Sequence, residues 1–417
     1  MKRVLVLLAS VLALLSCSPK EKEIYIPKDL QVMDLNDPES EYCYERMALT
    51  ENFAIFWEKG FGNDLAVAPE LEGQDMTIDL ENLKTRLETF YDYFYNDLGF
   101  AKKGSKADKY RMLVMLRYSL EGTAYGGDYD GEIGALWVTP NRLQDERLNC
   151  IAHELGHSFQ SQITCDGEGE AWGGCGFFEM TSQWMLWQVN PRWVEDESYH
   201  WDGFTSKCHK AYLHMTNIYH SPYILEFWGE KRGLKHIAEL YRQGKRGEDP
   251  AITYMRLNGL SQEEFCDEMY EASARIINLD YARAWEETKP YANRFSTKFN
   301  EGEDGWKHVD SEQCPECCGF NAVALPIPEK GKSVSVDFKG CADSAKAGWR
   351  YGFVAVCEGG STLYGEMGKE KVSTIEFTAP SDADLTHLWL VVMGAPSEYE
   401  MNSEEQYPYA VRVHADS

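Results

Sequence analysis

One stretch constrains this chain more than any other: the H-E-x-x-H motif formed by His153-Glu154-Leu155-Gly156-His157. On an α-helix, positions i and i+4 lie one turn apart on the same face. His153 and His157 can then both present an imidazole nitrogen to one metal ion, with Glu154 beside that ion. The motif therefore predicts a helix at this point of the chain and a metal site on one of its faces.

The residues around the motif also favour a helix. Thr139-Pro140, upstream of it, is typical of an N-cap followed by a proline in the first turn. Gln160 falls on the same face as the two histidines. Apolar residues recur at helical spacing and predict a stripe that faces the core: Leu148, Ile151, Ala152, Leu155 and Phe159.

Two histidines need a third ligand, because zinc in a catalytic site takes three protein ligands and keeps one position for water. A glycine and a histidine from the longer H-E-x-x-H-x-x-G-x-x-H pattern are absent, since Gln160 and Ile163 occupy those positions. A glutamate on a following helix is the other common solution, and Glu179 lies 22 positions after His157. Three acidic residues of the intervening loop are alternative ligands: Glu170, Glu168 and Asp166.

This pattern resembles the glutamate zincins, the thermolysin-like and alanyl-aminopeptidase-like group of zinc peptidases. The resemblance implies a Zn²⁺ ion held by His153, His157 and Glu179, with Glu154 as the catalytic base that carries the proton to the leaving amine. Gln183, one turn beyond Glu179, is expected to orient a ligand histidine through its free ring nitrogen. The related enzymes often have a carboxylate at that position.

Two further roles follow from the same resemblance. Zincins add a tyrosine or histidine that stabilises the oxyanion, and five residues are candidates here: Tyr212, Tyr219, Tyr223, His209 and His220. In these proteins the strand before the active-site helix borders the cleft and pairs with extended substrate. The resemblance therefore implies a substrate-edge strand formed by Gly134, Ala135, Leu136 and Trp137. The alternative is an ordinary sheet strand that does not contact substrate.

Hydrophobic periodicity predicts an α+β domain followed by an all-β domain. Strands are expected at 47–57, 111–119 and 135–138, the last after a glycine-rich stretch, and an amphipathic helix at 80–98. Helices are then expected at 177–189, 207–219, 223–228, 234–243 and 262–279. Six short strands, separated by glycine and proline, predict a β-sandwich: 322–325, 333–338, 351–356, 373–377, 388–392 and 409–413. The expected fold class is therefore a zincin-like domain at 25–295 and a β-sandwich domain at 296–417.

The N-terminus indicates export. Residues 1–3 form a short n-region with two basic side chains, Lys2 and Arg3, and the apolar residues 4–15 are too few to span a bilayer, which takes roughly 20. Leu14-Leu15-Ser16-Cys17 resembles the lipobox of bacterial lipoproteins, in which the peptide is cut before the cysteine and Cys17 carries lipid. We expect a signal peptide at 1–16, a lipidated tether at 17–24, and an extracytoplasmic protein anchored to a bacterial membrane, at the outer membrane or cell surface.

Charge and cysteine content limit the function further. Lys+Arg 41 against Asp+Glu 68 gives a net charge of −27, which repels phosphate backbones and disfavours nucleic-acid binding. With Cys17 assigned to lipid, an odd number of the 12 cysteines is left, so at least one thiol is unpaired. Cys314 and Cys317 lack a second Cys-x-x-Cys at zinc-ribbon spacing. Structural disulfides or buried thiols are therefore favoured over a second metal site.

A second resemblance covers most of the mature chain. Residues 348–356, 388–396 and 407–409, together with the motif helix, are similar to an uncharacterised family of bacterial surface lipoproteins. That family joins a zincin-like domain to a C-terminal β-sandwich and implies no substrate. We therefore predict zinc-dependent hydrolysis of peptide bonds in an extracellular protein or glycoprotein. The alternative is a non-catalytic binding or adhesion lipoprotein for host protein or glycan.

Overall fold

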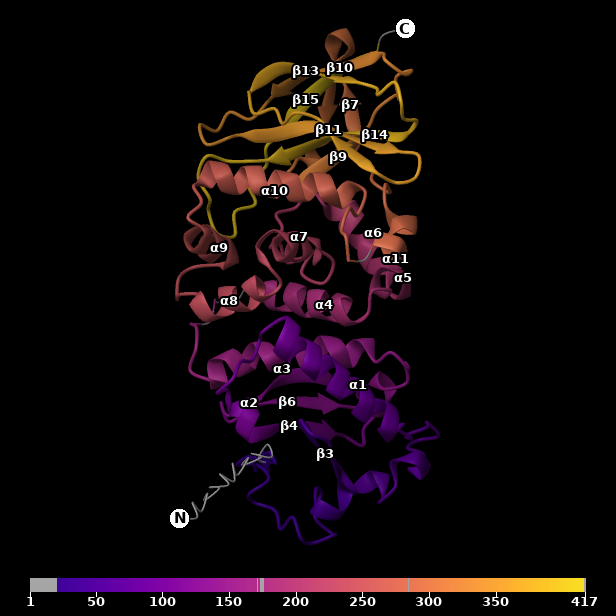
Figure 1. The fold of residues 1–417 in the computed structure, drawn as a ribbon, viewed down its shortest axis with the longest axis vertical. Helices are drawn as coiled ribbons and strands as arrows, with labels where there is room; N and C mark the ends of the chain where they lie inside the picture. The colour runs from indigo at the N-terminus through magenta and orange to yellow at the C-terminus, as the bar shows by residue number, and fades with distance from the viewer. Residues whose placement is uncertain (1–20, 171, 173–175, 284, 416–417) are drawn as a thin grey trace, which may run out of the picture.

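Three layers follow one another along the long axis of the protein: a mixed sheet, a layer of helices, and two further sheets (Figure 1). The computed structural model describes residues 21–170, 172, 176–283 and 285–415. The expected signal peptide, the lipidation site Cys17 and most of the tether lie outside these residues. Among the described residues, no helix combines the length and the apolar character needed to cross a membrane.

The N-terminal sheet has the order β2-β3-β4-β6-β5, and β1 pairs with β4. Its strands are β1 (Glu23–Ile24), β2 (Met47–Leu49), β3 (Phe53–Trp57), β4 (Tyr110–Leu116), β5 (Ala124–Tyr129) and β6 (Ile133–Val138). β3, β4 and β6 are parallel neighbours, and apolar runs allow both of their faces to be covered. The single strand predicted at 47–57 is two antiparallel strands, because the polar residues Thr50 to Asn52 form the turn between them.

The strand predicted to pair with substrate lies inside this sheet. β6 pairs with β4 on one side, where Leu113 faces Ala135, and with β5 on the other, where Tyr125 faces Trp137. Both backbone edges are therefore already hydrogen-bonded. The substrate-edge assignment of Gly134, Ala135, Leu136 and Trp137 is wrong. The outermost strand on that side is β5. It lies in the glycine-rich stretch, for which the sequence pattern predicts no strand.

The motif lies on α3 (Asn149–Cys165), which packs across β5 and β6. This helix starts later than predicted. Pro140 begins a separate 3₁₀ turn (Pro140–Arg142), and Leu148 precedes α3 with a left-handed φ of 53°. α1 (Leu80–Asp92) runs into a π-turn (Tyr93–Asp97), as the helical spacing at 80–98 predicts, and α2 (Lys106–Lys109) is short.

The middle layer is helical. Its members are α4 (Phe177–Val189), α5 (Trp193–Asp196), α6 (Ser198–Lys207), α7 (Tyr223–Arg232), α8 (Lys235–Gln243), α9 (Pro250–Asn258), α10 (Gln262–Ile277) and α11 (Trp285–Thr288). The helix predicted at 207–219 is absent, since α6 ends at Lys207 and turns follow. Local polar side chains compete with a helix there: the Asn217 amide donates to the Lys207 carbonyl, and the Thr216 N–H donates to the His214 ring.

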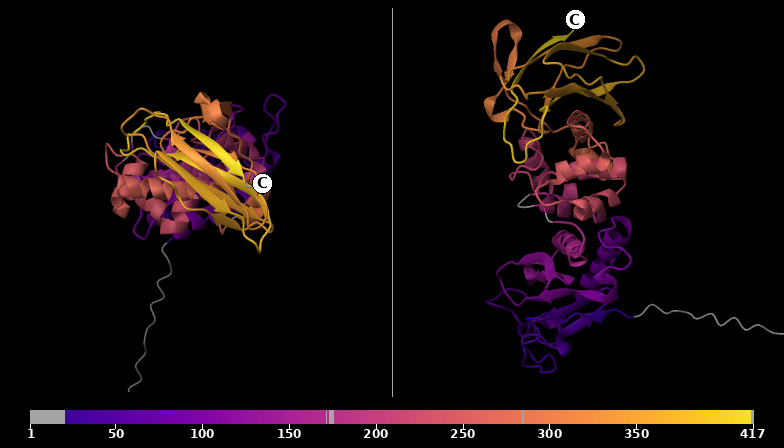
Figure 2. Two further views of the ribbon diagram at one scale, coloured as in Figure 1. Left: turned by 90° about the horizontal axis from the view of Figure 1, so that it is seen from above. Right: turned by 90° about the vertical axis from the view of Figure 1, so that its left-hand side faces the viewer.

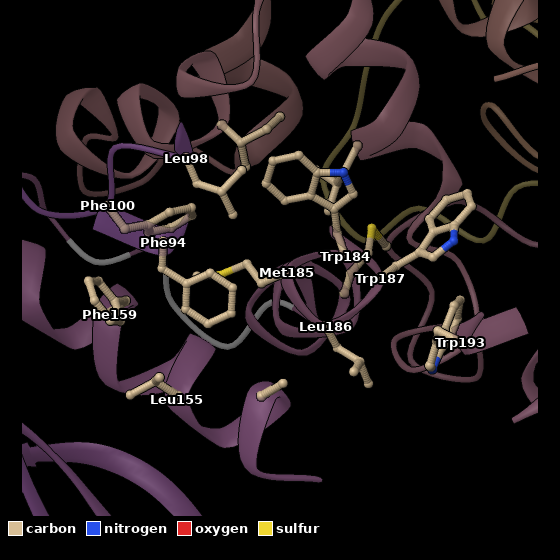
Figure 3. Packing of buried hydrophobic residues seen from close by; sticks show 14 of the residues in the cluster. Phe94, Leu98, Phe100, Leu155, Phe159, Trp184, Met185, Leu186, Trp187 and Trp193 are labelled. Carbon is tan, nitrogen blue, oxygen red and sulfur yellow. The ribbon is translucent and has the colours of Figure 1, made fainter. Parts of the chain in front are cut away.

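Apolar packing sets the distance between α3 and α4. Figure 3 shows Leu155 and Phe159 of α3 beside Phe94, with Met185 of α4 on the other side of that ring; all four are buried. Gly156 permits this approach, because a Cβ there would lie 2.9 Å from the Ser182 hydroxyl. Burial of each such side chain contributes about 1.5–3 kcal/mol.

Two antiparallel sheets form the C-terminal layer, with strand orders β13-β10-β15-β8-β7 and β12-β11-β14-β9. Their strands are β7 (Phe299–Glu301), β8 (Lys307–Val309), β9 (Phe320–Ala324), β10 (Ser333–Gly340), β11 (Trp349–Cys357), β12 (Thr362–Tyr364), β13 (Val372–Thr378), β14 (Leu385–Gly394) and β15 (Tyr409–Ala415). Phe338 of β10 and Tyr351 of β11 stack at 3.9 Å in the core between the sheets. The sheets thus pack face to face, as the strand pattern predicts.

The helical layer joins the other two layers. α10 packs against β11 and β14, and Figure 2 shows it directly beneath the sandwich. The ten cysteines among the described residues are all free, and most are buried. The sequence left structural disulfides and buried thiols as alternatives, and the described cysteines are thiols, most of them buried.

Candidate metal centre

Helices α3 and α4 bring together the three side chains proposed as ligands. The Glu179 Oε2 lies 3.1 Å from His153 Nε2 and 3.0 Å from His157 Nε2. One ligand atom from each residue lies within 4.8 Å of the other two. Within the described ranges, this is the single group of three or more His, Cys, Asp or Glu side chains that meets this spacing.

The proton positions on His153 follow from the amide of Gln183. The Gln183 Nε2 lies 3.0 Å from the Tyr219 carbonyl oxygen, which can only accept a hydrogen bond. This contact orients the amide, so the Gln183 Oε1 faces His153 Nδ1 at 3.0 Å. His153 therefore carries its proton on Nδ1, and its Nε2 presents a lone pair toward Glu179.

The amide of Gln160 fixes the position of the proton on His157 in the same way. Its Nε2 donates to the Phe178 carbonyl oxygen and to the Ser182 hydroxyl, both at 3.0 Å. Its Oε1 then accepts a hydrogen bond from His157 Nδ1 at 3.2 Å. Both imidazoles thus direct an Nε2 lone pair at the same carboxylate oxygen.

This donor set fits a divalent metal ion of the zinc class. Two imidazole nitrogens and one carboxylate oxygen are ligands that zinc prefers, and lone pairs at such short range repel one another unless a cation lies between them. Burial opposes ionisation of Glu179, yet the positive charge and N–H groups that the two imidazoles offer when they are fully protonated hold its pKa well below the usual range. Against the effect of burial, the same carboxylate raises the pKa of His157. The pocket between these atoms therefore favours positive charge.

Glu154 lies on the β5 side of this group. Its Oε2 accepts a hydrogen bond of 2.8 Å from the Gly126 N–H. A Cβ at Gly126 would lie 1.8 Å from the Glu154 carbonyl oxygen, so glycine is required for this approach of strand and helix. Burial raises the pKa of Glu154, against the effect of the neighbouring imidazoles.

A cavity of about 530 Å³ opens over His153, His157 and Glu179. Glu154, the three candidate ligands and β5 residues 124–126 line one part of it, and the aromatic side chains of Trp172, Phe178 and Tyr241 line another. Tyr219 also reaches this cavity, with its ring centroid 6.1 Å from that of His153. Burial and the charge of Glu179 raise the pKa of Tyr219 to about 12, so its hydroxyl stays protonated at neutral pH.

The other four oxyanion candidates do not line this cavity. Tyr212 and Tyr223 are buried in the apolar core, and the His220 ring contacts His200. His209 is buried, and its carbonyl accepts a hydrogen bond from the Glu316 N–H. Tyr219 is therefore the one member of that set that lines the cavity over His153, His157 and Glu179.

The alternative acidic ligands have partners elsewhere. Glu168 pairs with Lys102 and Arg242 at 2.6 and 2.7 Å. Asp166 accepts a 2.8 Å hydrogen bond from the Lys106 N–H, and Glu170 accepts one of 2.7 Å from the Arg246 N–H. None of the three is grouped with His153 and His157, whereas Glu179 is.

Sequence reasoning missed two parts of the site. No strand is predicted in the glycine-rich stretch before 135–138, where the structure has β5, although Tyr125 and Tyr129 among small residues are a signal for a strand. The second is His200 of α6, whose Nε2 lies 3.1 Å from the Gln183 Nε2. No local pattern marks that histidine, because its contact with α4 is purely tertiary.

Fold and site together define a mixed helix-and-sheet protein with a candidate metal centre in a cleft. The chain belongs to the family of unknown function DUF6055, whose profile matches residues 16–416. No curated protein matches it.

Solved structures show weak similarity. The ZmpB metallopeptidase from Clostridium perfringens is 12% identical with a TM-score of 0.32, over 87% of this chain and 68% of that one. The M60 catalytic domain of that protein with its CBM51-1 and CBM51-2 domains is 9% identical with a TM-score of 0.32, over 89% and 59%. A family 22 carbohydrate binding module of Clostridium thermocellum Xyn10B is 12% identical with a TM-score of 0.20, over 29% and 79%. Scores this low do not establish a shared fold.

Proposed function

We propose that this protein is a zinc metallopeptidase, anchored to a bacterial surface through lipid on Cys17, that hydrolyses peptide bonds in an extracellular protein or glycoprotein. One observation carries the proposal. His153, His157 and Glu179 converge on one point at the wall of a cavity, and the Glu154 carboxylate lines the same cavity. This is the residue set that metal-assisted hydrolysis needs.

The chain's own residues supply the remaining steps. His153, His157 and Glu179 would hold the ion, which when bound supplies Lewis-acid activation of a carbonyl and of water. Glu154 takes a proton from the attacking water and passes it to the leaving amine. Its raised pKa brings this carboxyl closer to neutral pH, where such transfers are efficient. The protonated Tyr219 hydroxyl donates a hydrogen bond to the developing oxyanion.

Strand β5 replaces β6 as the proposed binding edge for the substrate. It is the outermost strand of the described sheet on that side, and Ala124, Tyr125 and Gly126 line the cavity. An extended peptide can add to such an edge through main-chain hydrogen bonds. Tyr125 is 60% exposed at the rim, so its ring is available to contact a substrate side chain.

The experiment compares the soluble mature chain with His153→Ala and Glu154→Gln. We expect about one zinc ion per chain by mass spectrometry, loss of that ion in His153→Ala, and its retention in Glu154→Gln. A peptide and glycopeptide library should be cleaved by the unmutated chain and about 10²–10⁴-fold more slowly by Glu154→Gln. Equal cleavage by Glu154→Gln would refute the mechanism. Bound zinc without any cleavage would favour the adhesion alternative.

A further inference from the structure

A chain of hydrogen-bonded side chains runs from His153 away from the cavity. It begins with the 3.0 Å contact between His153 Nδ1 and Gln183 Oε1. From there the Gln183 Nε2 lies 3.1 Å from His200 Nε2, and the His200 Nδ1 lies 2.8 Å from His220 Nδ1. Four residues from α3, α4, α6 and the turns after α6 are thus connected in series.

The direction of each hydrogen bond can be worked out. The Gln183 amide nitrogen has two hydrogens, one of which goes to the Tyr219 carbonyl oxygen at 3.0 Å. The other points to His200 Nε2, which must therefore accept it. A neutral His200 then carries its proton on Nδ1 and donates it to His220 Nδ1. Each residue therefore donates a hydrogen bond to the next one, from His153 through Gln183 and His200 to His220, whose Nδ1 accepts the last hydrogen bond.

Packing holds these rings in place. His200 is 8% exposed and stacks on Trp193 with a centroid distance of 5.6 Å. The His220 ring lies against Gly203 of α6, where a Cβ would approach its atoms to 3.1 Å. Burial and the neighbouring His200 lower the pKa of His220 to about 4, so this ring stays neutral and can accept a hydrogen bond.

The carboxylate of Glu197 lies beside His200. Its Oε2 lies 3.4 Å from His200 Nε2, farther than the Gln183 amide nitrogen. Its carboxylate also accepts hydrogen bonds from the Asn149 amide at 3.1 Å and the Trp193 indole at 3.0 Å. Gln183 therefore keeps the shorter contact with His200.

We propose that His200 and His220 are positioning residues of the metal centre, which hold the Gln183 amide in the orientation that makes His153 a ligand. This inference rests on the proposed zinc site. If the amide rotated by 180°, its NH₂ group would face His153 Nδ1 and force the proton onto Nε2. The His153 Nε2 would then have no lone pair for a metal ion. Second-layer partners of this kind change metal affinity by about 10–100-fold.

The test measures zinc affinity of the full mature chain by competition with a chromophoric chelator. His200→Phe keeps the ring packing on Trp193 but removes both nitrogens, and should weaken zinc binding about 10-fold. His220→Phe should lower zinc affinity less, because Gln183 keeps its direct contact with His200. The matched control is His236→Phe, another partly buried histidine, which contacts Asn258 on α9 and has no link to this series. Its zinc affinity should equal that of the unmutated chain.

Cobalt substitution supplies a readout that a general loss of stability does not imitate. The visible spectrum of bound Co²⁺ reports the ligand field, and it should change in His200→Phe but not in His236→Phe. Zinc affinity of His200→Phe within twofold of the unmutated chain, with an unchanged cobalt spectrum, would overturn the inference. If His200→Phe does not fold, as judged by near-UV circular dichroism, the same criteria apply to His220→Phe. An unmutated chain that binds no zinc would instead refute the proposed function.

Discussion

The candidate metal centre and the β-sandwich both bury their key side chains, but the interactions that hold those side chains differ. In the sandwich, Val336 and Phe338 of β10 meet Phe353 of β11 in a core of apolar side chains. At the candidate metal centre, Gln160 and Gln183 are almost as fully buried, and each amide is hydrogen-bonded at both ends.

This difference predicts different responses to substitution. Apolar packing has no direction, so its loss lowers stability roughly in proportion to the volume removed. A buried hydrogen-bond network has direction, and altering one member changes the protonation or orientation of the next. Substitutions in the sandwich should therefore act on folding, whereas those around α3 and α4 should act on metal binding and cleavage.

The largest expected effect is that of Glu179→Ala. It removes the carboxylate that contacts both imidazoles, so zinc content should fall to background and cleavage should stop. Stability of the metal-free chain should change little, because the Glu179 side chain is part-exposed at the cavity. Metal analysis and urea unfolding measure the two properties separately. Retention of zinc would assign the third ligand to another residue.

Phe338→Ala should have the opposite profile. Phe338 is fully buried and stacks on Tyr351, so its truncation should cost about 3–5 kcal/mol in the free energy of unfolding. Zinc affinity of the folded fraction should stay the same, since the residue packs within the sandwich core. Urea denaturation followed by fluorescence checks the first expectation and chelator competition the second. A parallel loss of zinc affinity would show that the two regions form one cooperative unit.

Gly126→Ala should reduce cleavage about 100-fold through misplacement of Glu154, with a smaller effect on zinc affinity. The added Cβ clashes with the Glu154 carbonyl oxygen and pushes β5 away from α3. Gly127→Ala is the matched control on the same strand, because the atoms nearest to its Cβ would belong to the Tyr125 side chain, from 3.1 Å, and not to α3. Steady-state kinetics of both variants test this point. Equal activity of the two would show that the approach of β5 is unimportant for catalysis.

Local periodicity predicted many of the elements. The helix at 177–189 coincides with α4, and all six strands proposed between 322 and 413 correspond to strands of the two C-terminal sheets. The errors lie where polar side chains or glycines override periodicity. The turns after Lys207 replace a predicted helix because Asn217 and His214 satisfy backbone groups locally. The sequence pattern does not predict β5 because its glycines lower strand propensity, although one of them, Gly126, permits the approach of this strand to α3.

The candidate ligands were accessible from sequence because the chemistry is local. Spacing of i and i+4 places His153 and His157 on one face of any helix, and a glutamate on the next helix is one of few ways to complete the set. The partners that orient those ligands were only partly accessible. Gln183 follows from its position one turn beyond Glu179, whereas His200 and His220 reach it through contacts that no spacing rule encodes.

The sequence by itself determined the helix that carries the motif, the alternation that makes two sheets pack, and the residue types able to hold a metal ion. These properties depend on neighbours within a few residues, where helix and strand geometry place side chains predictably. Tertiary structure decided that Glu179 meets both histidines, that β5 and not β6 borders the cleft, and that two glutamine amides direct both Nε2 lone pairs inward. Each of these outcomes depends on how α3 packs against α4 and β5, and that packing is set by Gly126, Gly156 and the apolar core between the helices.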